Sequence, residues 1–402
     1  MTTRRRLEAP WLTAPETEAV VAALGPGNLR FVGGAVRDSL VGRPVTDIDI
    51  ATPLTPDEVM RRAAAAGLKA IPTGIDHGTV TLVSDHRPFE VTTLRRDVET
   101  FGRRARVAFT DDWNADAARR DFTINALYAD AEGQLYDYFG GVADLEAGRV
   151  RFIGDPRERI IEDALRILRF FRFHAHFGRG ALDAGGLAAC IGERHRLDQL
   201  SIERVRDELL KLLAAPDPVP ALEAMQEAGI LDMVLPEARS LDALRRLVGI
   251  DTALARVDPL RRLAALLGRD SRRLERVGGR LRLSNRERRR LAAMAGEAPR
   301  ADACALRAAA YRFGCETTAD RLILGADPAR LPELQAAMAT LADLKPPRFP
   351  LKGRDLVAAG HEPGPELGRT LARLEEEWVA SDFALSKAEL LRRATGNKGG
   401  AA

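Results

Sequence analysis

The chain has few cysteines, few lysines and few aromatic residues, and it has no long apolar run. Its three cysteines, Cys190, Cys304 and Cys315, lie far apart among 402 residues and show no Cys-X-X-Cys spacing, so neither a zinc site nor a disulfide framework is indicated. No apolar run near the N-terminus is long enough for a signal or membrane helix. Hydrophobic residues make up 46% and charged residues 30% of the chain, a balance typical of a globular protein, which we expect to be cytoplasmic.

Lysine is scarce: only six of the 61 basic residues are lysines, and the formal net charge is only +3. The total charge is therefore weak support for nucleic-acid binding. The arginines gather most densely in one stretch: Arg272, Arg273, Arg276, Arg280, Arg282, Arg286, Arg288, Arg289 and Arg290. This stretch fits either a solvated helix pair or a phosphate-binding face, and the sequence leaves both open.

Residues 29–50 have the pattern of a strand, a glycine turn, a short helix and a second strand. Gly33 and Gly34 allow a sharp turn without a Cβ, and the N–H groups that begin the following helix can face an anion. Arg37 lies in the first helical turn, where its guanidinium can join them on a phosphate. Asp38 can either cap this turn or hold Arg37 in place.

Two aspartates follow on the second strand. Because side chains alternate along a strand, Asp47 and Asp49 share one face while Ile48 and Ile50 take the other. Two carboxylates can hold divalent cations about 3.5–4 Å apart, which activate a hydroxyl and stabilise a leaving oxyanion in phosphoryl transfer. A glycine turn or an Asp-X-Asp alone is common, but their combination predicts a nucleotidyl-transfer site. Glu90, on a later strand, is either a third carboxylate of this site or a surface residue.

The remaining periodicity of the first 140 residues predicts an α+β head. We expect helices over 14–25 and 55–66 and strands over 68–71, 78–83 and 88–94. Residues 95–118 lose this periodicity and are expected to form a long charged loop. Residues 119–127 are expected to open a helix, from which Arg120 can meet a phosphate or a ribose. Beyond residue 148 only 150–153 has a strand pattern, and the rest is predicted to be helical.

A second informative stretch is expected to form one helix over 155–174, capped by Asp155. Asp163 and Arg166 are three residues apart and are therefore expected on one face, where Arg169 and Arg172 continue the row. This row is either a ligand-binding row or an ordinary charged face.

Two further features are expected in this helical region. Ile161, Leu165 and Leu168 have the spacing of an apolar stripe, and Arg204 and Glu208 have the spacing of an ion pair within one helix.

In these motifs the chain resembles the class II tRNA nucleotidyltransferases, which add the terminal CCA to tRNA, and the related bacterial poly(A) polymerases. The resemblance runs in motif order from about residue 29 to residue 213 and continues more weakly to residue 389. The matching motifs are Gly-Gly-Ala-Val-Arg-Asp with Asp-Ile-Asp, Arg119-Arg120-Asp121, Glu162-Asp163-Ala-Leu-Arg166, and Glu203-Arg204 with Glu208.

The resemblance implies an architecture. The α+β nucleotidyltransferase head, of the polymerase β type with a mixed sheet, would occupy 1–140. An all-α remainder would follow, with a neck over 141–215 that recognises the nucleotide base, a body over 216–344 and a tail over 345–402 that binds tRNA.

The resemblance also implies site residues. Mg²⁺ would be held by Asp47 and Asp49, the catalytic residues together with Glu90, while Gly34 and Arg37 would contact the triphosphate of ATP or CTP. Asp163 and Arg166 would read the base, and Arg120 would lie at the ribose. The full nucleotide-binding set would be Gly33, Gly34, Arg37, Asp38, Arg120, Asp121, Asp163, Arg166, Arg169 and Arg172.

The expected function is template-independent addition of CCA to the 3′ end of tRNA from CTP and ATP, with release of pyrophosphate. A poly(A) polymerase shares the helical motif, and enzymes that add only CC or only A share most motifs. The stretches that begin at His77, Phe89 and Gly102 favour the CCA-adding branch. A non-catalytic tRNA-binding protein on the same fold is a further alternative, against which Asp47 and Asp49 count.

Overall fold

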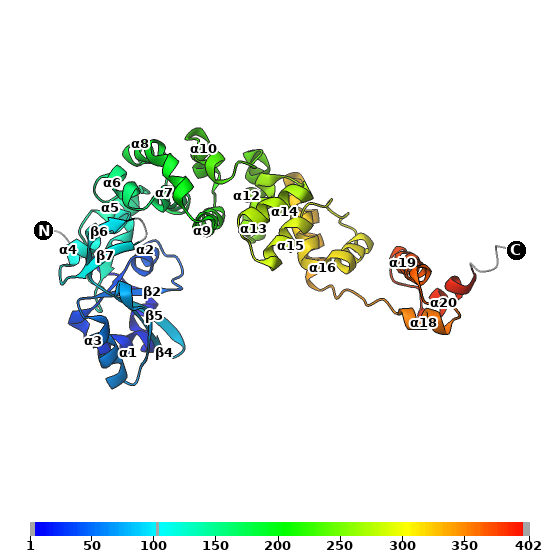
Figure 1. Ribbon diagram of the computed structural model, residues 1–402, viewed down its shortest axis with the longest axis horizontal. Coiled ribbons are helices and arrows are strands. Elements are labelled where there is room, and N and C mark those ends of the chain that lie inside the picture. The colour runs from blue at the N-terminus through cyan, green and yellow to red at the C-terminus, as the bar shows by residue number, and fades with distance from the viewer. Residues whose placement is uncertain (1–4, 102–103, 397–402) are drawn as a thin grey trace. The chain divides into compact units, whose positions relative to one another are not determined.

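The computed structural model describes residues 5–101 and 104–396. The chain divides into two compact units, Met1–Pro236 and Glu237–Ala402, which run from blue to green and from green to red in Figure 1. Gly102 and Arg103, in one of the stretches that favour the CCA-adding branch, lie outside the described residues. Among the helices of the described residues, none combines the length and the apolar content needed to cross a membrane.

The first unit begins with a mixed seven-stranded sheet, which confirms the expected α+β head. The strand order is β3-β4-β5-β2-β1-β8-β9. Strands β2 and β5 run parallel, whereas the other neighbours in this sheet are antiparallel. The strands are β1 (Arg30–Val32), β2 (Ile48–Thr52), β3 (Lys69–Gly74), β4 (Thr79–Ser84), β5 (Arg87–Thr93), β8 (Leu127–Ala129) and β9 (Leu135–Asp137).

Three helices pack on this sheet. Helices α1 (Pro15–Leu24) and α3 (Pro56–Ala65) pack on each other and on β4, and α2 (Gly34–Leu40) packs on β1, β2 and β8. Helix α3 begins as expected, since the Thr55 side chain accepts a hydrogen bond from the Glu58 N–H. In β2, Ile48 and Ile50 are buried, so Asp49 faces the other way.

Two expectations for the head are wrong. Residues 95–118 form no long loop: β6 (Arg95–Phe101) and β7 (Arg104–Phe109) pair as a hairpin, and α4 (Trp113–Ala118) follows. The hairpin lacks the apolar alternation by which a strand is recognised.

Residues 119–127 open no helix, because a 3₁₀ turn over Thr123–Asn125 leads directly into β8. Every residue from Asp121 to Ala129 is buried, so this segment has neither the helical nor the strand period. Residues 150–153 form no strand of the sheet, and Phe152 makes a single bridge with Phe122.

The rest of the first unit is helical, as expected. Its helices are α5 (Gly141–Ala147), α6 (Pro156–Glu162), α7 (Leu165–Phe177), α8 (Ala184–Glu193), α9 (Ile202–Leu213), α10 (Val219–Glu227) and α11 (Leu231–Val234). Asp155 caps α6 by accepting hydrogen bonds from two backbone N–H groups, as expected.

The single helix expected over 155–174 is wrong. Asp163 is extended, with φ −150° and ψ 106°, and ends α6 before α7 begins. The expected apolar stripe is broken with the helix: Leu165 and Leu168 are buried, but Ile161 is 45% exposed. Two separate helices do not share one continuous face.

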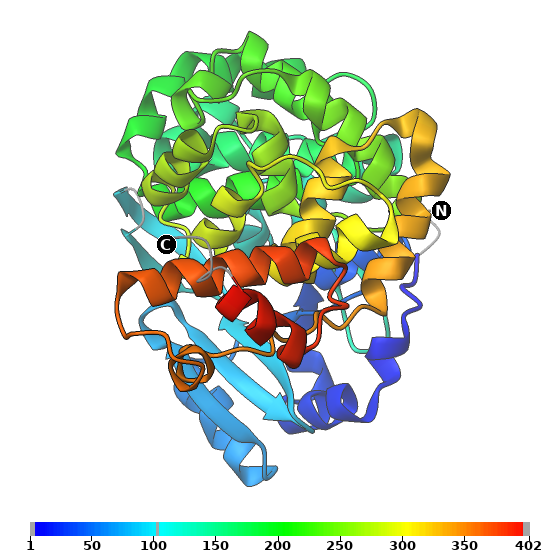
Figure 2. The same ribbon diagram turned by 90° about the vertical axis from the view of Figure 1, so that its right-hand side faces the viewer.

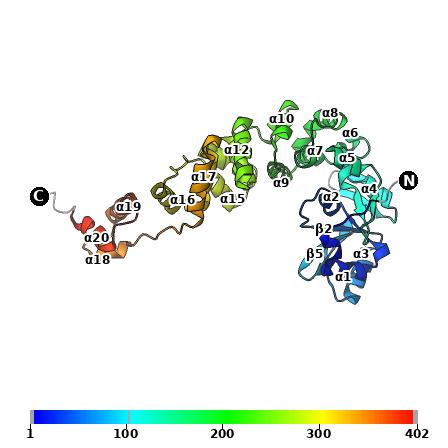
Figure 3. The same cartoon turned by 180° about the vertical axis from the view of Figure 1, so that it is seen from behind.

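The second unit consists of helices among its described residues. They are α12 (Leu241–Leu254), α13 (Pro259–Leu267), α14 (Ser271–Arg280), α15 (Asn285–Ala293), α16 (Ala303–Gly325), α17 (Leu331–Ala342), α18 (Gly353–Ala358), α19 (Pro365–Ala380) and α20 (Lys387–Gly396). Helix α16 is kinked at Gly314, with φ +80°, and α17 packs on it (Figure 3). Helices α18, α19 and α20 pack on one another, orange to red in Figure 2.

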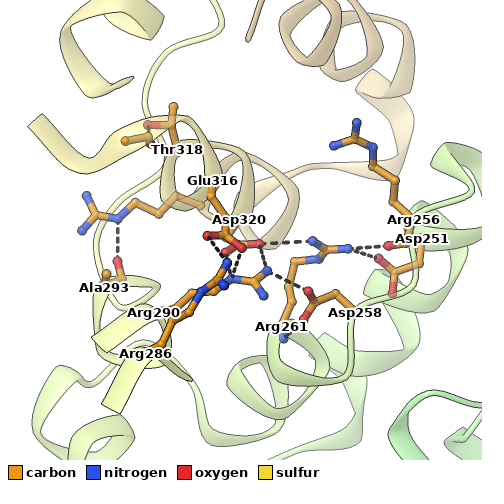
Figure 4. Close-up of polar contacts among 12 residues, drawn as sticks. Asp251, Arg256, Asp258, Arg261, Arg286, Arg290, Ala293, Glu316, Thr318 and Asp320 are labelled. Carbon is orange, nitrogen blue, oxygen red and sulfur yellow. Dashed lines mark hydrogen bonds and ion pairs between the residues drawn. The ribbon is translucent and has the colours of Figure 1, made fainter. Parts of the chain in front are cut away.

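A buried ion-pair network joins four helices of the second unit (Figure 4). The network consists of Asp251, Asp258, Arg261, Arg262, Arg290 and Asp320. Arg261 of α13 bridges Asp251 of α12 at 2.9 Å and Asp320 of α16 at 3.2 Å. Arg290 of α15 bridges Asp320 to Asp258, the residue that caps α13.

The arginine-rich stretch over 272–290 forms a helix pair, α14 with α15. Part of its charge is neutralised, because Arg280 pairs with Glu237 at 2.6 Å and Arg290 belongs to the network. Arg272, Arg276 and Arg289 are exposed. The pair is therefore partly structural and partly a basic surface.

Candidate active site

The glycine turn brings α2 to one side of a cavity. Gly33 has φ +68° and ψ −118°, a conformation that disfavours any side chain. A Cβ at Gly33 would lie 3.6 Å from Arg120 and 3.7 Å from the Asn125 carbonyl. These are ordinary contact distances, so residue 33 requires glycine because of its positive φ and not because of limited space.

Arg37 is almost fully buried behind this turn. Its Nε and NH2 atoms donate to Asp38 at 3.0 Å, and its NH1 atom donates to Asn125 Oδ1 at 2.5 Å. Burial lowers the pKa of Arg37, and Asp38 opposes this effect. Of the two roles expected for Asp38, the structure supports the second, because α2 has no side-chain cap and Asp38 holds Arg37.

The carboxylates of the sheet lie near one another. Asp49 is directly opposite Glu90 in the parallel pairing of β2 with β5, and Asp47 is exposed just before β2 begins. Burial and then the charge of Glu90 raise the pKa of Asp49, against the opposing effect of Arg120, to about 6. Among the described residues, no cluster of three or more His, Cys, Asp and Glu residues has the geometry of a metal site.

These side chains fit a divalent cation whose coordination shell is completed by a substrate. Mg²⁺ is commonly held by one or two carboxylates together with water and substrate phosphates. Glu90 and Asp47 contribute to the raised pKa of Asp49 because they place negative charge near it, and a bound cation would offset this charge. Asp47 and Asp49 are therefore the residues that would hold the ion.

A cavity of about 400 Å³ collects most of the expected residues. Its lining is Gly33, Gly34, Arg37, Asp49, Arg120, Asp121, Asn125, Asp163, Leu165, Arg166, Arg169, Phe173 and Arg204. Asp38, Asp47, Glu90 and Arg172 are expected site residues that do not line it. Five arginines outnumber three aspartates in this lining, which suits a polyphosphate.

Sequence reasoning missed four lining residues: Asn125, Leu165, Phe173 and Arg204. Asn125 and Phe173 carry no local signal, since their importance comes from contacts with Arg37. Arg204 is part of a recognised motif, but its partner was expected within its own helix.

Arg120 is held by a buried acid and a tyrosine. Its Nε atom donates to the Tyr128 hydroxyl at 3.1 Å and its NH2 atom donates to Asp116 at 3.3 Å. Tyr128 in turn donates to Asp116 at 2.7 Å. Burial alone would lower the pKa of Arg120, but Tyr128 and Asp116 raise it, so the guanidinium stays charged at the cavity wall.

The two residues expected to read the base, Asp163 and Arg166, do not share a helix face, so that expectation is wrong. Asp163 lies between α6 and α7, where it accepts from the Leu165 N–H at 3.1 Å and from Arg204 NH2 at 2.7 Å. Arg166, on α7, donates to the Arg159 carbonyl at 2.7 Å and pairs with Glu162. Both nevertheless line the cavity. Aspartate often accepts hydrogen bonds from the N–H groups at the start of a helix, so Asp163 itself was the sequence signal for a break between α6 and α7.

The pairing of Arg204 with Glu208 is also wrong. Arg204 reaches Asp163, and Glu208 pairs instead with Arg172 at 2.7 Å. Arg169 donates to Asp121 at 2.7 Å. Burial acts to raise the pKa of Asp121, but Arg169, Asn125 and Arg166 together outweigh it and the pKa is lowered.

The fold and the site define a nucleotidyltransferase with the head of a poly(A) polymerase. Residues 29–151 match the family described as "Poly A polymerase head domain", and residues 186–241 match "Probable RNA and SrmB- binding site of polymerase A". The chain is 36% identical to the CCA tRNA nucleotidyltransferase 1, mitochondrial, of Danio rerio, over 90% of this chain and 86% of that protein. It is 31% identical to the CCA-adding enzyme of Limosilactobacillus fermentum, over 90% and 92%.

A solved structure agrees with these relatives. The crystal structure of the Bacillus stearothermophilus CCA-adding enzyme in complex with CTP superposes with a TM-score of 0.78 at 28% identity, and the match covers 97% of this chain and 98% of that one. The chain belongs to the family of CCA-adding tRNA nucleotidyltransferases.

Proposed function

We propose that this protein adds CCA to the 3′ end of tRNA from CTP and ATP without a nucleic-acid template, releasing pyrophosphate at each step. The observation that carries the proposal is the cavity in which Asp49 lies beside five arginines. An acid that can hold a metal and cations that can hold a triphosphate are what nucleotidyl transfer needs.

The metal is a divalent ion, and we infer that it is Mg²⁺ at Asp47 and Asp49. When bound, such an ion lowers the charge on the reacting phosphate and activates the attacking hydroxyl. The chain's own residues bind and orient the substrate. Arg37 would hold the triphosphate, and Asp38 and Asn125 restrict the directions that its guanidinium can take.

We assign base selection to Asp163 and Arg166. Cytosine and adenine both present an amino donor beside a ring-nitrogen acceptor, so a carboxylate and a guanidinium can read either one. Uracil and guanine invert this pattern. Two contacts support the assignment, because Arg204 donates to one oxygen of Asp163 and Glu162 pairs with the guanidinium of Arg166.

The division of the chain is part of the proposal. We assign 1–140 to the catalytic head, 141–215 to the neck with the base-reading residues, 216–344 to the body and 345–402 to a tRNA-binding tail. We propose a cytoplasmic location.

One assay tests the function. Transcripts of tRNA that end at the discriminator base, at C or at CC are each incubated with one labelled nucleotide. The proposal expects C, C and then A in order, followed by termination. Long A tracts would identify a poly(A) polymerase instead, and a stop after CC or addition of A alone would identify a partial enzyme. Binding of tRNA without any incorporation would identify a non-catalytic protein.

A further inference from the structure

Two aromatic rings of α7 lie close to guanidinium groups of α2 and of α7 itself. The Phe173 ring lies 4.3 Å from the guanidinium carbon of Arg172 and 5.2 Å from those of Arg37 and Arg169. The Phe177 ring stacks on it at 6.0 Å and lies 4.3 Å from Arg37. Arg37 belongs to α2 of the head, whereas the other residues belong to α7.

The grouping places like charges together in a buried setting. Arg37, Arg169 and Arg172 are all largely buried, and their main carboxylate partners are Asp38, Asp121 and Glu208. Glu208 also lies 3.7 Å from Arg169. These carboxylates offset the charges, but none of them pairs with all three arginines. Phe173 is the group that all three guanidinium groups share.

An aromatic ring can hold a cation without competing for its phosphate ligand. The face of the ring attracts a guanidinium through its quadrupole, and attraction increases when water is excluded. A carboxylate, in contrast, occupies the N–H groups that a phosphate would take. Phe173 is 5% exposed and lines the same cavity as Arg37 and Arg169, so the ring and these two guanidinium groups lie at one site.

We propose that Phe173 is a positioning residue for triphosphate binding, and that its ring, backed by Phe177, orients Arg37 and Arg169 toward the phosphates. This inference rests on the proposed function, because it assigns those arginines to the incoming nucleotide. The role depends on the electrons of the ring and not on its volume alone.

Packing is the competing explanation, since Phe173 also contacts the Phe122 ring at 5.3 Å. Phe170, one turn earlier on α7, provides a matched control. It is fully buried and contacts Phe122, Phe152 and Phe171, and among the described residues no guanidinium lies over its ring.

The test is graded fluorination of one ring at a time in the full-length protein. 4-Fluoro-, 3,5-difluoro- and 3,4,5-trifluorophenylalanine keep the shape of the ring but progressively weaken its attraction for cations. At position 173 we expect the KM for both CTP and ATP to rise stepwise, roughly three- to thirtyfold in all, with kcat within twofold of the unmodified enzyme. The inhibition constant of inorganic tripolyphosphate, which has no base or ribose, should rise in parallel. The same series at position 170 should leave all three quantities unchanged.

Two outcomes of the fluorination series overturn the inference: no change at position 173, or equal changes at positions 173 and 170, which would mean that the ring only packs. Phe173→Tyr should retain most of the affinity for tripolyphosphate and Phe173→Leu should lose it. Equal loss in both variants would also count against an interaction of the ring with the guanidinium groups. Tripolyphosphate binding to the protein can be measured without transfer. A protein that fails to add CCA but shows the graded loss of tripolyphosphate binding would therefore contradict the proposed function and still support the positioning role of Phe173.

Discussion

Asp49 combines burial with a neighbouring like charge. Burial, together with Glu90 in the adjacent strand, raises its pKa to about 6. The ionised carboxylate is therefore destabilised in the absence of a cation, and a bound divalent ion would offset the cost. Asp47, in contrast, is exposed at the start of the strand.

Replacement of either aspartate should abolish transfer but spare tRNA binding. Asp47→Asn and Asp49→Asn remove one negative charge with little change in shape, and we expect turnover to fall on the order of 10³-fold or more, because metal ions supply several kcal/mol of charge stabilisation. Single-turnover incorporation of labelled CTP and filter binding of tRNA measure the two effects. Asp57→Asn, an exposed carboxylate in the first turn of α3, is the control. Near-normal turnover in either variant would reject the metal assignment.

Asp163 makes two contacts that can be separated, since one carboxylate oxygen accepts from the Leu165 N–H at the start of α7 and the side chain also faces the cavity. Asp163→Ser keeps an acceptor oxygen for this N–H but is too short to reach a base. The preference for CTP over UTP in kcat/KM should fall roughly ten- to hundredfold, because a mismatched buried hydrogen bond costs on the order of 1–3 kcal/mol.

Asp155→Ser is the matched control for this prediction, because it makes the same exchange at the cap of α6, away from the cavity. Equal loss of activity with all four nucleotides in Asp163→Ser would contradict the base-reading role.

At the scale of elements, the hairpin of β6 and β7 replaces the expected loop beside the head sheet. The Thr110 N–H donates to the Leu94 carbonyl at 2.9 Å, and the Arg95 N–H lies 3.4 Å from Asp116. Asp116 also binds Arg120 of the cavity. The base of the hairpin is thus connected to the nucleotide site through one acid.

Shortening this hairpin should spare C addition and impair A addition, because one base-reading pair accepts both bases and a further element must set their order. Residues 100–105 can be replaced by Asn-Gly, since Glu99 and Arg106 are paired and a two-residue turn can close them. Rates of CTP and ATP incorporation on transcripts that end at the discriminator base and at CC test this. Equal loss of both steps would assign the hairpin a general role.

The network of the second unit determines how α12, α13, α15 and α16 pack. Asp251 and Arg262 are both fully buried and 2.7 Å apart. Asp251→Asn should lower the opening free energy of α12 and α13 by about 3–5 kcal/mol, because it removes the negative partner of a buried ion pair. Amide hydrogen exchange of these helices measures the change.

The control for the network prediction is the exposed pair of Asp242 with Arg245. Asp242→Asn should cost less than about 1 kcal/mol, as surface ion pairs usually do. If both substitutions have the same small effect, the network does not stabilise the second unit.

At the scale of the whole molecule, the tail is a separate apolar cluster that reaches back to α16. Trp378 and Leu374 are buried at its centre, and Tyr311 of α16 packs against it. Leu341 and Leu344 still belong to the cluster that precedes it. A truncation that spares the body must therefore end after Lys345.

Removal of the residues after Lys345 should weaken tRNA binding more than nucleotide binding. Phosphate contacts dominate nucleic-acid affinity, so the dependence of log affinity on log salt should become shallower by about one unit for each tRNA phosphate that the shortened protein no longer binds. Filter binding over a salt series measures the slope, and the KM for CTP serves as the internal control. An unchanged slope and affinity would show that tRNA binds elsewhere.

The sequence by itself determined the local features of this protein. The strand, glycine turn, helix and strand over 29–50 and the caps at Thr55 and Asp155 were all predictable, because each depends on residues a few positions apart. The α+β head and the helical remainder followed from the periodicity, and the mixed sheet followed from the resemblance of the motifs. The all-buried strand β8 was not predictable, because uniform burial removes the period by which a strand is recognised.

Only the tertiary structure decided which charges meet. Arg204 reaches Asp163 over 41 positions of sequence, and Arg169 reaches Asp121 over 48. With so many arginines in the chain, many pairings have acceptable local spacing, and the choice among them depends on where the backbone breaks and how α7 and α9 pack. The extended backbone of Asp163 turns its side chain away from the face of Arg166, toward Arg204 and the cavity. Such long-range packing is absent from any short stretch of sequence, and it decides which guanidinium groups face the nucleotide.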